Sequence, residues 1–192
     1  MKQLKYILLF LVAPFVLGAC SDDWGNDNPE MEHIYYFGPE VWGYDSSKTG
    51  NNNVVHYEVA QGKTVAIPMQ FWSEFVRSYD VTSFYYVTVD PSSENALVNG
   101  VDYEVVNASG SKISPNASGA YEMFWPQAKK GVQNVYIRAL NGSKGSFYLQ
   151  TFNPNSGLTL TNQDVSSTIQ NKTDNYEVRI FTQNYRIKIN IE

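Results

Sequence analysis

The stretch Thr64-Val-Ala-Ile-Pro-Met-Gln-Phe-Trp72 places apolar residues at every second position, which is the pattern of a half-buried β-strand. Val65, Ile67, Met69 and Phe71 share one face of this stretch. Residues 185–192 repeat the pattern, with a tyrosine and three isoleucines on one face and Arg, Lys, Asn and Glu on the other. No segment of helical length combines a 3.6-residue period with capping residues. The two stretches therefore predict an all-β chain.

The period of two continues along most of the chain from residue 31 onward. We expect further strands at residues 32–37, 54–59, 84–90, 103–106, 121–125, 134–140, 145–152 and 176–180. The segments between them, such as 45–53, 107–119 and 141–145, are rich in Asn, Gly, Ser and Pro, as loops are. Short strands with this spacing predict an antiparallel two-sheet sandwich in which residues 31–192 form a single domain.

Composition excludes several classes of protein. The chain has 192 residues, a net charge of −5, 17% charged residues and 15% aromatic residues, so it is neither a disordered acidic chain nor a basic nucleic-acid binder. One Cys excludes a disulfide scaffold, and two His give little material for catalysis. We expect no enzyme activity, no cofactor, no metal and no nucleic-acid partner. A glycosidase remains an open alternative, because its paired carboxylates meet in space and not in sequence.

The N-terminus has the features of a signal peptide. Lys2 and Lys5 precede an apolar run over residues 6–17, which is too short to span a bilayer as a helix. The run ends at Leu17-Gly18-Ala19-Cys20, which contains the only Cys and resembles the lipobox of bacterial lipoproteins. The resemblance implies that residues 1–19 are removed and that Cys20 is lipidated. The alternative is a plain secretory signal.

Residues 20–30 are expected to form an acidic linker between the lipid and the folded domain. Ser21-Asp22-Asp23 resembles the surface-export signal of Bacteroidota-type lipoproteins. The resemblance implies an outer-membrane protein held at the cell surface, with the membrane as one partner through the N-terminal lipid. A periplasm-facing protein with a solvated linker is the alternative.

Two motifs resemble the Calx-β family of immunoglobulin-like sandwiches. His56-Tyr-Glu-Val-Ala-Gln-Gly-Lys-Thr-Val-Ala-Ile-Pro68 is similar to the family's opening strand and turn, and Ala96-Leu-Val-Asn-Gly100-Val-Asp102-Tyr103 is similar to its A-x-x-G-x-D-Y signature. The resemblance covers about residues 54–181 and implies an immunoglobulin-like fold, as in uncharacterised Bacteroidota surface lipoproteins. Asn141-Gly-Ser-Lys144 stands where calcium-binding members are acidic, so we expect no Ca²⁺ site. Asp102 is expected to hydrogen-bond its own turn.

The chain has more aromatic residues than the expected core faces account for, because several rings lie on the opposite faces of the strands. Rings exposed in this way are suited to stacking on sugars or anchoring a protein partner. They can equally be cross-strand pairs, or be covered by the N-terminal strand and the loop that holds Trp42. The candidate ligand-binding residues are Trp42, Trp72, Tyr86, Tyr136 and Tyr148.

These observations predict a non-catalytic binding module. The expected ligand is a glycan or glycoprotein, captured as an accessory to nutrient uptake. The alternative is a structural or adhesion subunit that adds a strand to a partner, with residues 185–192 expected at a sheet edge.

Overall fold

A computed structural model describes residues 33–40, 55–158 and 167–192. The described residues contain no α-helix and a single 3-10 turn, η1 (Pro126–Ala128), which confirms the all-β prediction. The strands are β1 (Ile34–Pro39), β2 (Val55–Val59), β3 (Thr64–Trp72), β4 (Val81–Val89), β5 (Tyr103–Val106), β6 (Tyr121–Trp125), β7 (Gly131–Ala139), β8 (Gly145–Gln150), β9 (Ser167–Lys172), β10 (Glu177–Phe181) and β11 (Arg186–Ile191).

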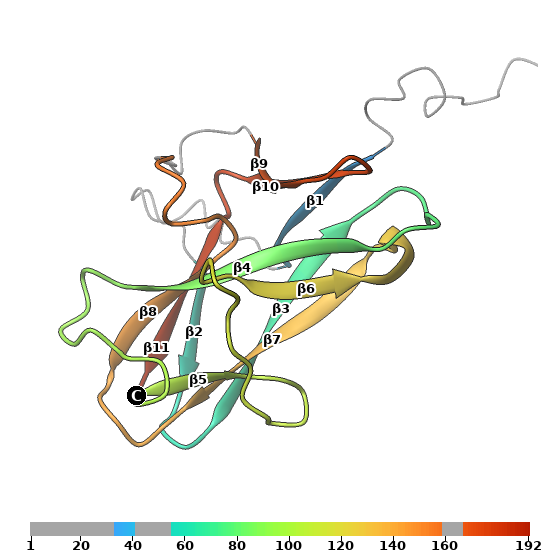
Figure 1. Cartoon of the computed structure of the whole chain (residues 1–192). Coiled ribbons are helices and arrows are strands. Elements are labelled where there is room, and N and C mark those ends of the chain that lie inside the picture. The colour runs from blue at the N-terminus through green and yellow to red at the C-terminus, as the bar shows by residue number, and fades with distance from the viewer. Residues whose placement is uncertain (1–32, 41–54, 159–166) are drawn as a thin grey trace, which may run out of the picture. The chain divides into compact units, whose positions relative to one another are not determined.

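The strands form two sheets that face each other across one core. The first sheet has the order β5-β7-β3-β1-β10-β9, and the second has the order β2-β11-β8-β4-β6 (Figure 1). Residues Ile34–Glu192 group into one compact unit by their contacts. Among the described residues, no helix is long and apolar enough to cross a membrane.

The expectation of a purely antiparallel sandwich is wrong at two strand pairs. β1 runs parallel to β10 and β2 runs parallel to β11, while the other pairs are antiparallel. Parallel neighbours cannot be joined by a tight hairpin and need a long crossover. Here the two early strands lie beside the two last strands, so most of the chain forms each crossover (Figure 1).

The C-terminal strand does not lie at an edge, contrary to the sequence-based expectation. β11 is hydrogen-bonded to β2 on one side and to β8 on the other. Its Ile187, Ile189 and Ile191 are buried, which explains their regular alternation. The strands at the sheet edges are β5, β9, β2 and β6.

Aromatic rings connect the two sheets through the core. The ring of Phe71 on β3 stacks on Trp125 of β6, with centroids 5.0 Å apart. The ring of Tyr103 on β5 stacks on Phe147 of β8, with centroids 4.1 Å apart. The indole N–H of Trp125 donates to the buried Ser83 hydroxyl at 2.8 Å, so this large side chain is both packed and satisfied.

Side chains of β9 and of Tyr176, the residue before β10, close one side of the sandwich. The Gln170 amide bonds both backbone groups of Phe84, accepting from its N–H at 2.9 Å and donating to its C=O at 2.6 Å. The Asn171 amide donates to the Thr82 C=O, and the Tyr176 hydroxyl accepts from the Thr82 N–H. These side chains bond backbone groups of β4 that a neighbouring strand would bond elsewhere in the sheet. They also connect the two sheets to each other.

Candidate functional site

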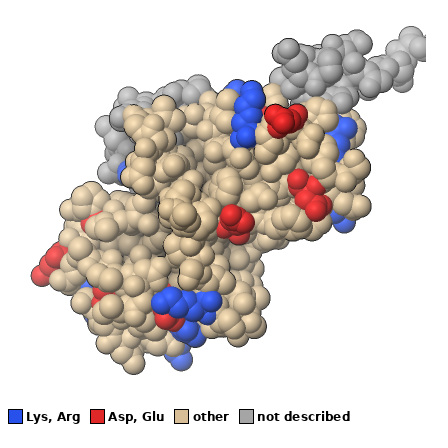
Figure 2. Space-filling model, viewed as in Figure 1, with Lys and Arg blue, Asp and Glu red and all other residues tan. Residues whose placement is uncertain are grey.

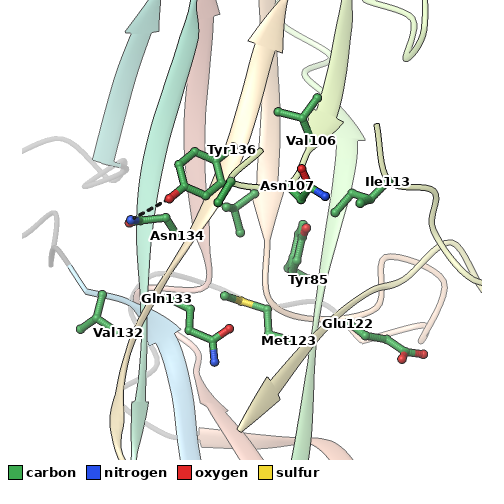
Figure 3. Close-up of a pocket in the computed structure, with 12 residues that line it drawn as sticks. Tyr85, Val106, Asn107, Ile113, Glu122, Met123, Val132, Gln133, Asn134 and Tyr136 are labelled. Carbon is green, nitrogen blue, oxygen red and sulfur yellow. Dashed lines mark hydrogen bonds between the residues drawn. The ribbon is translucent and has the colours of Figure 1, made fainter. Parts of the chain in front are cut away.

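The other side of the sandwich contains a pocket of about 440 Å³, which lies in the range of small-ligand sites. Strands β4, β5, β6 and β7 and the segment that follows β5 contribute to it (Figure 3). Within β7, residues 136–139 are the ones that pair with β5, so the first half of β7 borders the opening. The lining residues are Tyr85, Val106, Asn107, Ala108, Ile113, Glu122, Met123, Val132, Gln133, Asn134, Val135 and Tyr136.

A buried tyrosine supplies a polar group at the floor of the pocket. The Tyr85 ring is 3% exposed and stacks on Tyr121, with centroids 5.1 Å apart. Asn99 donates to the Tyr121 hydroxyl at 2.8 Å, whereas the Tyr85 hydroxyl has no hydrogen-bond partner in the described part of the chain. Burial, and then the neighbouring Tyr121, raise the pKa of Tyr85 well above its ordinary value. Tyr85 is therefore a neutral phenol that can donate a hydrogen bond.

Asn107 holds the rim of the pocket above Tyr85. Its Oδ1 accepts hydrogen bonds from the Ser109 and Ser111 backbone N–H groups, at 3.1 and 2.9 Å, and from the Ser109 hydroxyl. No described residue accepts a hydrogen bond from its Nδ2. In Figure 3 the Tyr85 hydroxyl points toward Asn107, whose side-chain nitrogen is directed toward Ile113. Both residues line the pocket, so this end of it contains two hydrogen-bond donors.

The turn at Asn107 has a near copy nine residues later. Asn107-Ala-Ser-Gly110 and Asn116-Ala-Ser-Gly119 each end on a glycine with positive φ, +82° and +79°. Asn116 Oδ1 accepts from the Ser118 and Ala120 N–H groups, as Asn107 Oδ1 does in its own turn. The sequence-based search missed these turns as pocket elements, although the repeated Asn-Ala-Ser-Gly was visible.

A glutamine closes the lower end of the pocket. The Gln133 side chain on β7 donates through Nε2 to the Phe124 C=O on β6 at 2.6 Å. Beside it, the side chain of Met123 is buried and turns its sulfur toward the centre of the pocket (Figure 3). This end therefore combines one amide with apolar surface.

Of the four aromatic candidates that the structure describes, Tyr136 is the one that lines the pocket. It is half-buried on β7, and the Asn134 amide lies 3.5 Å from its hydroxyl (Figure 3). Trp72 is on the same outer face of the sheet, six residues along β3 from Ala66, the residue that pairs with Tyr136. Six residues of strand span about 20 Å, so the two rings are too distant to share one sugar unit.

Trp72 belongs to a separate aromatic cluster. Phe181 stacks on Tyr36 with centroids 5.0 Å apart, and Trp72 meets Phe181 edge-on at 5.6 Å. A Cβ on Gly38 would lie 3.6 Å from the Trp72 ring, so the indole lies against this glycine. For Trp72, therefore, the alternative holds in which an outward ring packs against rings of neighbouring strands.

The expectation of an exposed ring is wrong for Tyr86. Its side chain is 6% exposed, and burial raises its pKa. Tyr148 is half-buried on β8 beneath the guanidinium of Arg186, whose Cζ lies 4.8 Å from the ring centroid. Trp42 and Cys20 lie outside the described residues.

Asp102 bonds its own turn, as expected from the sequence. Its Oδ2 accepts from the Val98 N–H at 2.7 Å, and its Oδ1 accepts from the Ser143 N–H at 2.6 Å. These backbone hydrogen bonds, that from Val98 first, lower the pKa of Asp102. Gly100 adopts a φ of +88°, which explains the glycine in this motif. Asp102 therefore also joins its turn to the loop that holds Ser143.

The described residues offer no group of three or more His, Cys, Asp and Glu that is placed to hold a metal ion. His56 is exposed on β2, away from the pocket-lining residues. Glu122 is the sole carboxylate among the described lining residues. Its side chain is exposed, and in Figure 3 its carboxylate points away from Tyr85. The interior of the pocket is therefore lined by uncharged groups.

No protein-family model and no curated protein matches this chain. The case for a function therefore depends on the chemistry of the site. The face of the molecule in Figure 2 carries only scattered charged side chains, and most of its surface belongs to uncharged residues. On this face, then, the protein offers little for a highly charged ligand to bind.

Proposed function

We propose that this protein is a non-catalytic binding module that captures glycans at the cell surface. The observation that carries the proposal is the pocket beside β7, which combines Tyr136, amides and a buried phenol with an apolar wall. Sugars present flat C–H faces that pack on aromatic rings and hydroxyls that bond amides. The pocket matches both requirements without an ionic partner.

A non-catalytic role fits the carboxylates of the site. Most glycoside hydrolases use two carboxyl groups that flank the scissile bond. Among the described lining residues Glu122 stands alone, and its side chain is directed outward. A binding site needs no such pair, which favours capture of the glycan over its cleavage.

The anchoring of the module is also part of the proposal. Residues 1–19 act as the signal peptide, Cys20 carries the lipid, and the acidic residues after it direct the protein to the outer face of the outer membrane. The domain is of the immunoglobulin-like Calx-β type, and the Asp102 turn, with Gly100 at positive φ, supports that resemblance. Labelled fatty acid will be incorporated by the wild type and not by Cys20→Ala, and protease added to whole cells will remove the protein.

Immobilised glycans test the binding role. We expect the full-length protein to bind at least one neutral polysaccharide, and Tyr136→Ala to weaken that binding about fivefold through loss of the stacked ring. Tyr148→Ala is the matched control, because Tyr148 is also a half-buried ring on an outer sheet face but does not line the pocket. Equal binding by both variants and the wild type would reject the pocket as the glycan site.

A second candidate is a structural or adhesion subunit that pairs strands with a partner through β6. Among the described strands, this edge strand pairs only with β4, and Phe124 on it is 53% exposed. Edge strands that expose apolar residues are templates for pairing with another chain. If this role is correct, light scattering will detect concentration-dependent assembly that Phe124→Lys abolishes, and the protein will be monomeric if glycan capture is its only role.

A further inference from the structure

We propose that the pocket recognises an N-acetylated amino sugar, with the acetamido group of the sugar placed between Tyr85 and Asn107. This inference rests on the proposed function, because it names the ligand class of the same site. It is carried by the unpartnered Tyr85 hydroxyl and by the apolar wall around it.

The Tyr85 hydroxyl opens onto the pocket and makes no hydrogen bond to another described residue. It is not one of the fully buried polar atoms that lack a partner, so it is accessible to a molecule that enters the pocket. The ring of Tyr85 is almost completely buried, yet its hydroxyl points toward the Asn107 end of the pocket (Figure 3). An acceptor oxygen on a bound ligand would satisfy this donor.

Asn107 supplies a second donor and leaves no acceptor free. Its Oδ1 already accepts three hydrogen bonds within its own turn, so its Nδ2 is the group that remains for a ligand. Two neutral donors at one end of a pocket favour a strong neutral acceptor, and an amide carbonyl is such a group. A sugar hydroxyl is a weaker acceptor and fills less space.

Apolar surface beside the two donors suits the methyl of an acetamido group. Val106 and Met123 are both buried and line the pocket with the partly buried Ile113. A methyl group placed among them is removed from water, which is favourable. A free ammonium group would lose its hydration without a carboxylate to pair with, which is unfavourable. The pocket therefore favours the acetylated sugar over both the unsubstituted sugar and the free amine.

Three oligosaccharides that differ only at carbon 2 give a direct test. Titrations of the full-length protein use chitin, chitosan and cellulose tetrasaccharides, which carry an acetamido, an amino and a hydroxyl group there. We expect the chitin tetramer to bind at least about tenfold more tightly than the other two, because a site built to bond a group rejects analogues that lack it.

Tyr85→Phe removes the hydroxyl and keeps the ring that stacks on Tyr121. We expect it to weaken binding of the chitin tetramer about fivefold and to leave binding of the cellulose tetramer unchanged. Asn107→Asp retains the Oδ1 that holds the turn and loses the Nδ2 donor, so it should have the same selective effect. Tyr148→Phe is the matched control, and thermal melting of each variant confirms that it is folded.

The outcomes separate this inference from the proposed function. Equal, Tyr136-dependent binding of the chitin and cellulose tetramers would overturn the acetamido assignment and retain glycan capture. Loss of both sugars in Tyr85→Phe would also overturn it, because the hydroxyl would then not read the acetamido group. Absence of binding to these sugars and to every neutral polysaccharide would reject the proposed function and this inference with it.

Discussion

The Gln170 side chain bonds both the N–H and the C=O of Phe84, so an amide on β9 takes the place of a strand beside β4. The same Nε2 also donates to the Thr151 C=O. One side chain thus satisfies three backbone groups that lie between the two sheets.

Gln170→Ala tests this bridge. The substitution leaves the three backbone groups without their partner, so we expect the free energy of unfolding to fall by about 2–3 kcal/mol. Urea denaturation measures the change. Gln61→Ala is the control, because Gln61 makes one exposed bond to the Gly142 C=O and its removal should cost under about 1 kcal/mol. Similar losses in the two variants would contradict the role of the bridge.

A buried ion pair makes stability depend on pH. Burial alone would raise the pKa of Asp90, but hydrogen bonds from Lys188, Ser146 and Ser92 outweigh it and hold this pKa far below its ordinary value. Because the pKa is lower in the folded state, the stabilisation is complete above the unfolded-state value of about 4 and is lost as the pH falls below it.

Asp90→Asn should therefore lower the free energy of unfolding by about 3 kcal/mol at neutral pH, because it leaves the Lys188 ammonium without the carboxylate 2.7 Å away. The difference between the variant and the wild type should shrink as the pH falls from about 4 to about 2. Urea denaturation at a series of pH values measures it. A difference that does not change over this range would show that the Asp90–Lys188 pair is not responsible for the pH dependence of stability.

The contact between two loops depends on a glycine without a side chain. A Cβ on Gly142 would clash with Asp102 Oδ1 and lie 2.7 Å from the Val101 C=O. Gly142→Ala should thus separate the loops and destabilise the protein by about 2 kcal/mol. Gly131→Ala is the control, because a Cβ there would meet no atom within 4 Å. Thermal melting should give a lower Tm for Gly142→Ala and an unchanged Tm for Gly131→Ala. An unchanged Tm in both variants would contradict the close approach at Gly142.

Backbone strain is stored in the turn after β6. Gln127 and Ala128 have φ values of +55° and +50°, which L-residues adopt at a cost of about 1 kcal/mol each. Gln127 is exposed, and its N–H donates to Asp80 at 2.8 Å. Gln127→Gly should keep this bond and raise stability by about 1 kcal/mol. Lys129→Gly, at a φ of −72°, should lower stability instead, and a loss in both variants would argue against strain.

The sequence predicted the strands well because the core faces are regular. Ile67, Met69 and Phe71 are buried as expected, and so are Val135 and Ile137. Alternation did not mark β9 as a strand, because its Ser-Thr-Ile-Gln-Asn-Lys sequence has no buried face and its amides act by bonding β4. The strand order was not predictable, since alternation fixes which face is buried and not which strand lies alongside.

The site was harder to predict than the fold. Tyr136 was found because its ring is opposite a core face, and it lines the pocket. Tyr86 satisfies the same rule and is buried, so an outward position did not guarantee exposure. Tyr85 shares a strand face with Val87 and Val89, so alternation places it in the core, and nothing in that alternation distinguishes a hydroxyl directed into a pocket. Asn107 acts through a turn geometry that becomes recognisable only when both copies of the turn are compared.

In each of the two Asn-Ala-Ser-Gly turns the asparagine side chain accepts backbone hydrogen bonds from the turn itself. Outside bonds are few: Arg138 donates to the Gly110 C=O, and Asn116 donates to the Glu122 carboxylate. Exposed turn residues that line the pocket, such as Ala108, can therefore be substituted without loss of the turn conformation. Natural variation or directed selection at the mouth of the cavity could in this way alter which ligand enters without disturbing the sheets beneath.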